Sequence, residues 1–138
     1  MSQKLMIEKF ARDVLGCTCP DSVFKKIECG WRVIDSINKV FEIQIGGRLL
    51  IFLWDEEISN VKKTIHSVLQ CGRDFRDNKS FNRFRLVITS NLNEEIRRDI
   101  EEQFQKNSQV DDKIHLHFIP RNQIPKKIYK TQTEDGEG

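Results

Sequence analysis

Apolar residues recur at helical spacing in four stretches of the chain. The first covers residues 3–15, and a second, short one begins at Pro20. A third follows the acidic residues 55–57 and is expected to end near Gly72 or somewhat beyond, and a fourth begins with Glu94. Each stretch places apolar side chains every three or four positions. Each is therefore predicted to be a helix with one face buried against the rest of the protein.

Between these helices, the pattern changes to alternation or to short apolar runs, which predicts strands. Gly46-Gly47 is typical of a tight hairpin turn, and the apolar run that follows it indicates a strand buried on both faces. The first strand is predicted to begin at Trp31. Four more strands are predicted over residues 40–45, 49–54, 84–90 and 113–119.

The order of these elements predicts an α/β (or α+β) fold with a mixed sheet of four to five strands. A β-hairpin is followed by a βαβαβ arrangement, and the two N-terminal helices pack on the sheet. Residues 1–125 are expected to form a single globular domain. Residues 126–138 are polar and are predicted to be a disordered tail.

Composition narrows the function classes. The chain has 138 residues and a formal net charge of +2, so charge gives no global indication of a nucleic-acid or membrane partner. No apolar run approaches the roughly 20 residues that span a bilayer, and the first residues lack the apolar block of a signal peptide. These features predict a cytoplasmic protein, in which cysteines are mostly reduced.

The segment Cys17-Thr18-Cys19-Pro20 carries the most specific chemistry of the sequence. It precedes a predicted helix start, where the positive end of the helix dipole lowers a thiol pKa. Cys19 is therefore a candidate redox-active thiolate, with Cys17 as the resolving thiol. The alternative is that both sulfurs are inert and pack at a corner between two helices.

The same cysteine pair is a candidate for metal or iron–sulfur binding. Such centres usually need four ligands, so Cys17 and Cys19 require further donors. If residues 20–28 form a helix, Cys29 lies roughly 15 Å from Cys19, which excludes it as a ligand. Cys71 is then the remaining cysteine candidate for a metal site with Cys17 and Cys19.

Two histidines and an acidic pattern are further candidates for catalytic or metal-binding groups. His115 and His117 lie two apart on a predicted strand and therefore point to the same face, either toward solvent or toward a covering helix. Asp35 followed by Glu42-x-Gln44 resembles the acidic pattern of restriction-endonuclease-like nucleases, which implies a divalent metal and phosphodiester hydrolysis. Gln44 replaces the lysine expected in that pattern.

A basic and aromatic stretch between the third helix and the fourth strand is predicted to be a loop over residues 73–83. Basic side chains interleaved with phenylalanines can bind phosphates and stack on bases. The alternative is a solvated connection whose phenylalanines lie under the sheet. The candidate surface for nucleic acid or another partner consists of Arg73, Arg76, Lys79 and Arg83.

The segment from Phe10 to Phe24 resembles small uncharacterised prokaryotic proteins that carry an L-G-C-x-C-P signature, here Leu15 to Pro20. The resemblance covers about the first thirty residues. It implies that the cysteine pair is a family trait, and it implies no activity or cofactor.

Three functions follow from these patterns. The first is thiol-based redox chemistry or metal binding through Cys17 and Cys19. The alternative is a non-catalytic interaction module, including a homodimer, that uses its helices or an unpaired strand edge. The third is a nucleic-acid binder that uses the basic stretch. The sequence assigns no reaction and no cofactor.

Overall fold

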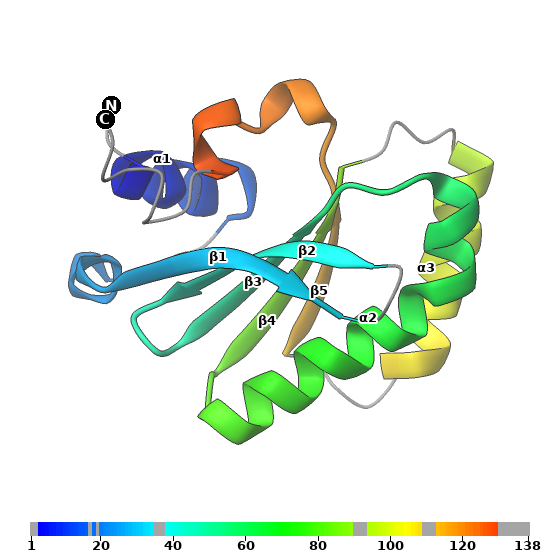
Figure 1. The fold of residues 1–138 in the computed structure, drawn as a ribbon, viewed down its shortest axis with the longest axis horizontal. Coiled ribbons are helices and arrows are strands. Elements are labelled where there is room, and N and C mark those ends of the chain that lie inside the picture. The colour runs from blue at the N-terminus through cyan, green and yellow to red at the C-terminus, as the bar shows by residue number, and fades with distance from the viewer. Residues whose placement is uncertain are drawn as a thin grey trace.

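The computed structural model describes residues 3–16, 18, 20–34, 38–89, 94–108 and 113–129, with the side chains of residues 58, 107 and 108 left aside. The chain forms a mixed α/β fold around one five-stranded sheet, in the order β1-β2-β3-β4-β5 (Figure 1). The sheet confirms the predicted mixed α/β class. Its strands are β1 Ile27–Val33, β2 Lys39–Ile45, β3 Leu49–Trp54, β4 Arg83–Ile88 and β5 Ile114–Phe118.

The sheet is antiparallel on one side and parallel on the other. Strands β1, β2 and β3 form an antiparallel meander, whereas β3, β4 and β5 run parallel. Parallel neighbours need a crossover connection, and here these are α2 (Ile58–Lys79) and α3 (Glu94–Ser108). Strand β1 therefore forms one edge of the sheet and β5 the other.

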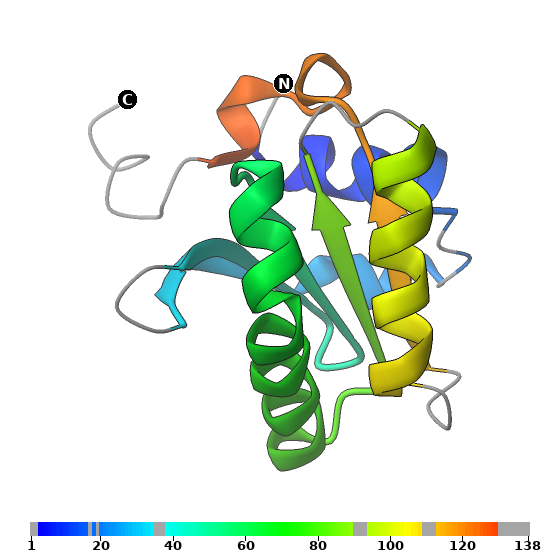
Figure 2. The ribbon, with the colours of Figure 1, turned by 90° about the vertical axis from the view of Figure 1, so that its right-hand side faces the viewer.

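The helices lie on the two faces of the sheet (Figures 1 and 2). Helix α1 (Gln3–Lys9) continues into a π-helical turn, Phe10–Val14, on one face, which we call the α1 face. Helices α2 and α3 cover the opposite face, which we call the α2 face. The sheet thus separates two layers of helices, and each layer buries its own core.

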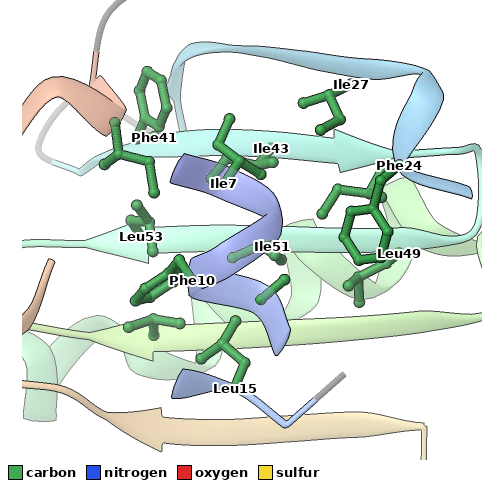
Figure 3. Packing of buried hydrophobic residues seen from close by; sticks show 14 of the residues in the cluster. Ile7, Phe10, Leu15, Phe24, Ile27, Phe41, Ile43, Leu49, Ile51 and Leu53 are labelled. Atoms are coloured by element: carbon green, nitrogen blue, oxygen red, sulfur yellow. The ribbon is translucent and has the colours of Figure 1, made fainter. Parts of the chain in front are cut away.

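The core on the α1 face joins α1 to the strands of the meander and to β4 (Figure 3). Side chains that alternate along β2 and β3 point to this face because successive residues of a strand point to opposite sides. The fully or almost fully buried members include Ile7, Phe10, Phe41, Ile43, Ile51 and Leu53.

The core on the α2 face uses the other set of strand residues. Leu50, Phe52 and Trp54 of β3 pack with Phe84 of β4, and the Phe52 and Phe84 rings meet edge-on at 5.0 Å. All six residues of β3 are buried, as the uninterrupted apolar run predicts. Helix α2 contributes one apolar stripe to this core: Val61, Ile65, Val68 and Leu69.

The prediction of a second helix beginning at Pro20 is wrong. Residues Asp21–Lys25 form only a 3-10 turn, and Ile27 already begins β1, four residues before the predicted strand start. The spacing of Val23, Phe24 and Ile27 fits a helix, but Ile27, Cys29, Trp31 and Val33 also alternate as a strand does. Pairing with β2 along the whole of β1 favours the strand.

The predicted loop over residues 73–83 is also largely wrong, because α2 continues to Lys79. Ser80 ends the helix with a positive φ of 60°. The extension is amphipathic: Phe75 packs against the α2-face core, and Gln70 donates to Asp74 at 2.8 Å on the exposed side. Apolar contact on one side of the helix therefore outweighs its polar composition.

The folded domain extends past the predicted boundary at residue 125. Lys126–Tyr129 is a 3-10 turn in which Ile128 is fully buried, and Gln3 donates to the Ile128 carbonyl at 3.2 Å. Another turn, Arg121–Gln123, precedes it on the α1 face. In the described ranges, no helix is long and apolar enough to cross a bilayer.

Candidate functional site

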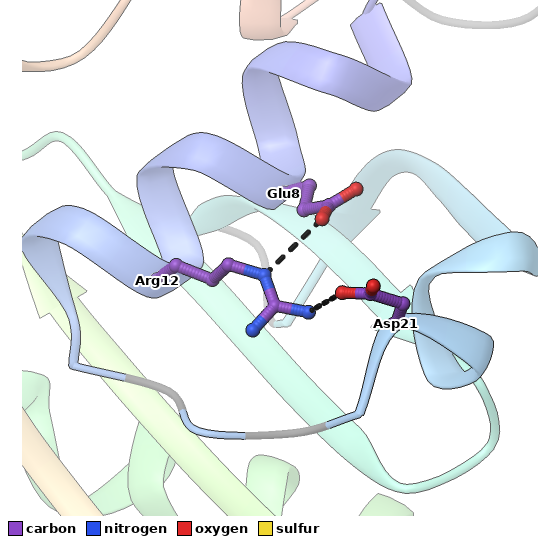
Figure 4. Close-up of polar contacts among 3 residues, drawn as sticks. All are labelled: Glu8, Arg12 and Asp21. Atoms are coloured by element: carbon purple, nitrogen blue, oxygen red, sulfur yellow. Dashed lines mark hydrogen bonds and ion pairs between the residues drawn. The ribbon is translucent and has the colours of Figure 1, made fainter.

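Cys17 and Cys19 lie outside the described residues, so their redox role remains a prediction. The chain on either side of them is held by Arg12, which donates to Glu8 at 3.1 Å and to Asp21 at 2.8 Å (Figure 4). The guanidinium of Arg12 also stacks over the Phe24 ring at 4.4 Å. One arginine thus ties the N-terminal helix to the turn before β1, on the α1 face.

The other two cysteines lie on opposite faces of the sheet. Cys29 is half-buried against the α1-face core, whereas Cys71 is half-buried against the α2-face core. Leu15 and Val23, described residues flanking the Cys17–Cys19 pair, belong to the α1-face core. Because the pair itself lies outside the described residues, a metal site that includes Cys71 stays a prediction, and the helix that was expected to exclude Cys29 is absent.

Burial also makes Cys71 a poor nucleophile. Desolvation is the largest effect on its thiol and raises the pKa above the usual value, with Arg32 acting in the opposite direction. A thiol with a raised pKa is mostly protonated at neutral pH and reacts slowly. Within the described part of the chain, no group of three or more histidine, cysteine or carboxylate side chains is placed to hold a metal ion.

The four residues of the predicted basic surface do not form one surface. Arg73, Arg76 and Lys79 lie on α2, and Arg76 is buried and pairs with Asp77 at 3.0 Å. Arg83 belongs to β4 and, with Val87, points to the α1 face. The sheet therefore separates Arg83 from the α2 residues.

The acidic pattern of the endonuclease-like hypothesis is not assembled in the described residues. Asp35 lies outside them. Glu42 on β2 pairs with Arg32 on β1 at 2.8 Å, and the guanidinium of Arg32 stacks over Phe75 of α2 at 4.4 Å. Glu42 thus holds the first two strands together across the α2 face.

The histidines of β5 share one face, as their spacing predicts, and each contacts an arginine of β4. Arg83 Nη1 lies 3.1 Å from His115 Nε2, and Arg85 Nη1 lies 2.9 Å from His117 Nε2. Because a guanidinium only donates, each imidazole accepts through Nε2 and is neutral, with its proton on Nδ1. Burial, with Arg85 and His115 acting in the same direction, lowers the pKa of His117 to about 4.

We expect the low pKa of His117 to make the protein less stable in mild acid. An unfolded histidine has a pKa of about 6.5, so between that pH and about 4 the unfolded chain takes up a proton that the native chain does not. The free energy of unfolding should therefore fall across this interval and level off below it. Urea unfolding of the native chain and of His117→Gln at several pH values measures the effect. His117→Gln should flatten the slope and His66→Gln, an exposed control, should not; equal slopes in all three chains would refute the assignment.

The outer edge of β1 exposes apolar side chains that the sequence analysis did not single out. Trp31 is 45% exposed and Val33 is 69% exposed, and both point to the α1 face. Trp31 is fixed by three neighbours: the Phe41 ring at 5.1 Å, the stacked Tyr129 ring at 5.7 Å and Lys39 Nζ at 4.7 Å. Half of a rigid indole thus faces outward beside an exposed valine.

The backbone of β1 also offers hydrogen-bonding groups at this edge. The bonds from Ile34 N to the Asn38 carbonyl and from Gly46 N to the Lys26 carbonyl show that even-numbered residues of β1 face β2. The N–H and C=O groups of Ile27, Cys29, Trp31 and Val33 therefore point away from the sheet. Among the described residues, no strand pairs with them.

A groove of about 510 Å³ opens between the end of β1 and α2. It is lined by Ile34 and by six residues of α2: His66, Ser67, Leu69, Gln70, Cys71 and Arg73. The groove lies on the α2 face, next to the same edge of the sheet that exposes Trp31 and Val33.

The chain matches no family model, no curated protein sequence and no solved structure.

Proposed function

We propose that the protein is a non-catalytic interaction module that forms a homodimer by pairing its β1 edge with β1 of a second copy. The observation that carries the proposal is the outward-facing backbone of β1 together with the exposed Trp31 and Val33. An open strand edge is a template for another strand, and proteins normally protect it with proline or charge at the exposed positions. Strand β1 contains no proline.

A second copy fits this edge because β1 is complementary to itself. In an antiparallel pair centred on Gly30, the outward backbone groups of Ile27 meet those of Val33 of the second copy. Apolar side chains then face apolar ones on the α1 face. The even-numbered residues, which point to the α2 face, place Glu28 opposite Arg32 of the second copy.

Gly30 suits the centre of such a pair. In this register, Gly30 faces Gly30 of the second copy in a non-hydrogen-bonded pair, where the Cα atoms approach to about 4.5 Å. A Cβ added at Gly30 would meet nothing within 4 Å in the isolated chain, so a cysteine side chain fits there on the α2 face.

The test is a site-specific disulfide. Cysteine at position 30 would face its own copy across the axis, so Gly30→Cys should give a covalent dimer on mild oxidation. Glu28→Cys is the matched control, since position 28 of the second copy lies roughly 13 Å farther along the strand. Non-reducing electrophoresis measures the cross-link, and light scattering of the native chain measures the mass in solution.

The proposal expects a native mass of two chains and a cross-link in Gly30→Cys that exceeds both the native chain and Glu28→Cys. A monomeric native chain at micromolar concentration would overturn it. So would a dimer in which Gly30→Cys cross-links no better than Glu28→Cys, because that dimer would not use this register. Circular dichroism confirms that both variants are folded.

A further inference from the structure

Two arginine–histidine pairs lie on the α1 face at the end of the sheet opposite β1. They consist of Arg83 and Arg85 on β4 and His115 and His117 on β5, and we call them the Arg–His ladder. The N-terminal helix crosses the sheet and ends at Leu15, next to β4 (Figure 3). Arg85 donates to the Leu15 carbonyl at 3.1 Å, and Arg83 lies beyond it and is exposed.

The ladder orders the positive charge of Arg83 without neutralising it at its contact with His115. Arg12, Arg32 and Arg121 each pair with a carboxylate. Arg83 instead donates to the neutral imidazole of His115, and within the described residues no carboxylate pairs with it. The guanidinium therefore keeps its charge and the donors of Nε and Nη2, while its position is fixed.

We propose that the Arg–His ladder binds a phosphate group, with the Arg83 guanidinium as the main donor and Arg85 as a second charge behind it. A guanidinium presents a planar fork of N–H groups that matches two phosphate oxygens. Arg83 and Arg85 are two residues apart on one strand, about 7 Å, so one bound group experiences both charges. The imidazole of His115 accepts from Arg83 and places no negative charge beside its guanidinium.

Two more basic residues, Arg48 and Lys113, contact the start of β4 through their backbones. The Arg48 carbonyl accepts the backbone N–H of Arg83 at 3.1 Å, and the Lys113 carbonyl accepts that of Phe84 at 3.0 Å. Arg48 and Lys113 are both exposed. These residues come from the β2–β3 turn and from the start of β5, so the backbones of three segments distant in sequence meet at the start of β4, each with a basic residue.

A phosphate group can come from a small molecule or from a nucleic-acid backbone, and the experiment separates these sources. The full-length chain is titrated with inorganic phosphate by calorimetry and with a single-stranded oligonucleotide by fluorescence anisotropy. Arg83→Gln removes the main donor, and Arg98→Gln removes another exposed arginine, on α3, as the matched control. Because a hydrogen bond to a charged group contributes about 1.5–3 kcal/mol, Arg83→Gln should weaken binding by about 10- to 100-fold.

Loss of phosphate binding in Arg83→Gln but not in Arg98→Gln supports the proposal. If only inorganic phosphate shows this difference, the source is a small molecule; if the oligonucleotide shows it too, the source is a nucleic-acid backbone. The proposal is overturned if neither probe binds at millimolar concentration, or if both variants weaken binding equally. Arg83→Lys keeps the charge without the fork, so binding that is fully retained there would argue against bidentate recognition.

Discussion

Replacing Gly72 by valine should lower the free energy of unfolding by about 3 kcal/mol, at the upper end of the range for an overpacked core. Gly72 is a buried residue in the middle of α2, and a Cβ added there would overlap the ring of Phe84. That ring is fully buried between α2 and the sheet and packs edge-on against Phe52, so it has little room to move. Urea or thermal unfolding at fixed protein concentration measures the loss.

The matched control is Gln70→Val, two residues earlier on the exposed side of the same helix. It introduces the same β-branched side chain, which costs less than about 1 kcal/mol through helix propensity alone. The difference between the two variants therefore isolates the contact with Phe84. If Gly72→Val is no less stable than Gln70→Val, close packing of α2 on β4 is not the reason for this glycine.

The strands could be predicted from the sequence wherever burial imposed a simple pattern. The apolar run of β3 required burial on both faces, and the alternation in β2 required one side chain in two to point to each face. The two glycines of the β2–β3 turn both have positive φ, as a tight hairpin requires. These signals are local, and so they can be read without knowledge of the fold.

Errors arose where tertiary contacts decided between two patterns. Ile27 and Cys29 fit the end of a helix as well as the start of a strand, and pairing with β2 decides for the strand. The second half of α2 is polar and basic, and it remains helical because Phe75 reaches the core while Asp74, Asp77 and Lys79 face outward. The sequence of a short segment shows neither the strand that pairs with it nor the core residues that it contacts.

The candidate site depended even more on non-local contacts. The two histidines of β5 were expected to share a face, but their contacts with Arg83 and Arg85 required knowing that β4 and β5 are neighbours. Trp31 was expected in a strand, yet its exposure follows from the position of β1 at the edge of the sheet. Its stacking partner Tyr129 lay in the segment predicted to be disordered.

Replacing Val33 by lysine should raise the dissociation constant of the proposed dimer by at least about tenfold. In the register centred on Gly30, Val33 faces Ile27 of the second copy, and a lysine there must lose water opposite an apolar side chain. Lysine on an edge strand is also a common device that prevents strand pairing. Sedimentation or light scattering over a dilution series measures the change.

The matched control is Leu5→Lys, since Leu5 is 56% exposed on α1 and the change of side chain is similar. Both variants lose an exposed apolar group and gain one positive charge, so a general effect of net charge on association appears in both. Val33 lies near the end of β1, where its side chain contributes little to the monomer, and the unfolding free energy of the monomer should hardly change. A dimer weakened equally by both substitutions would show that association depends on charge or on another surface. Only a loss of dimer that is confined to Val33→Lys supports pairing through β1.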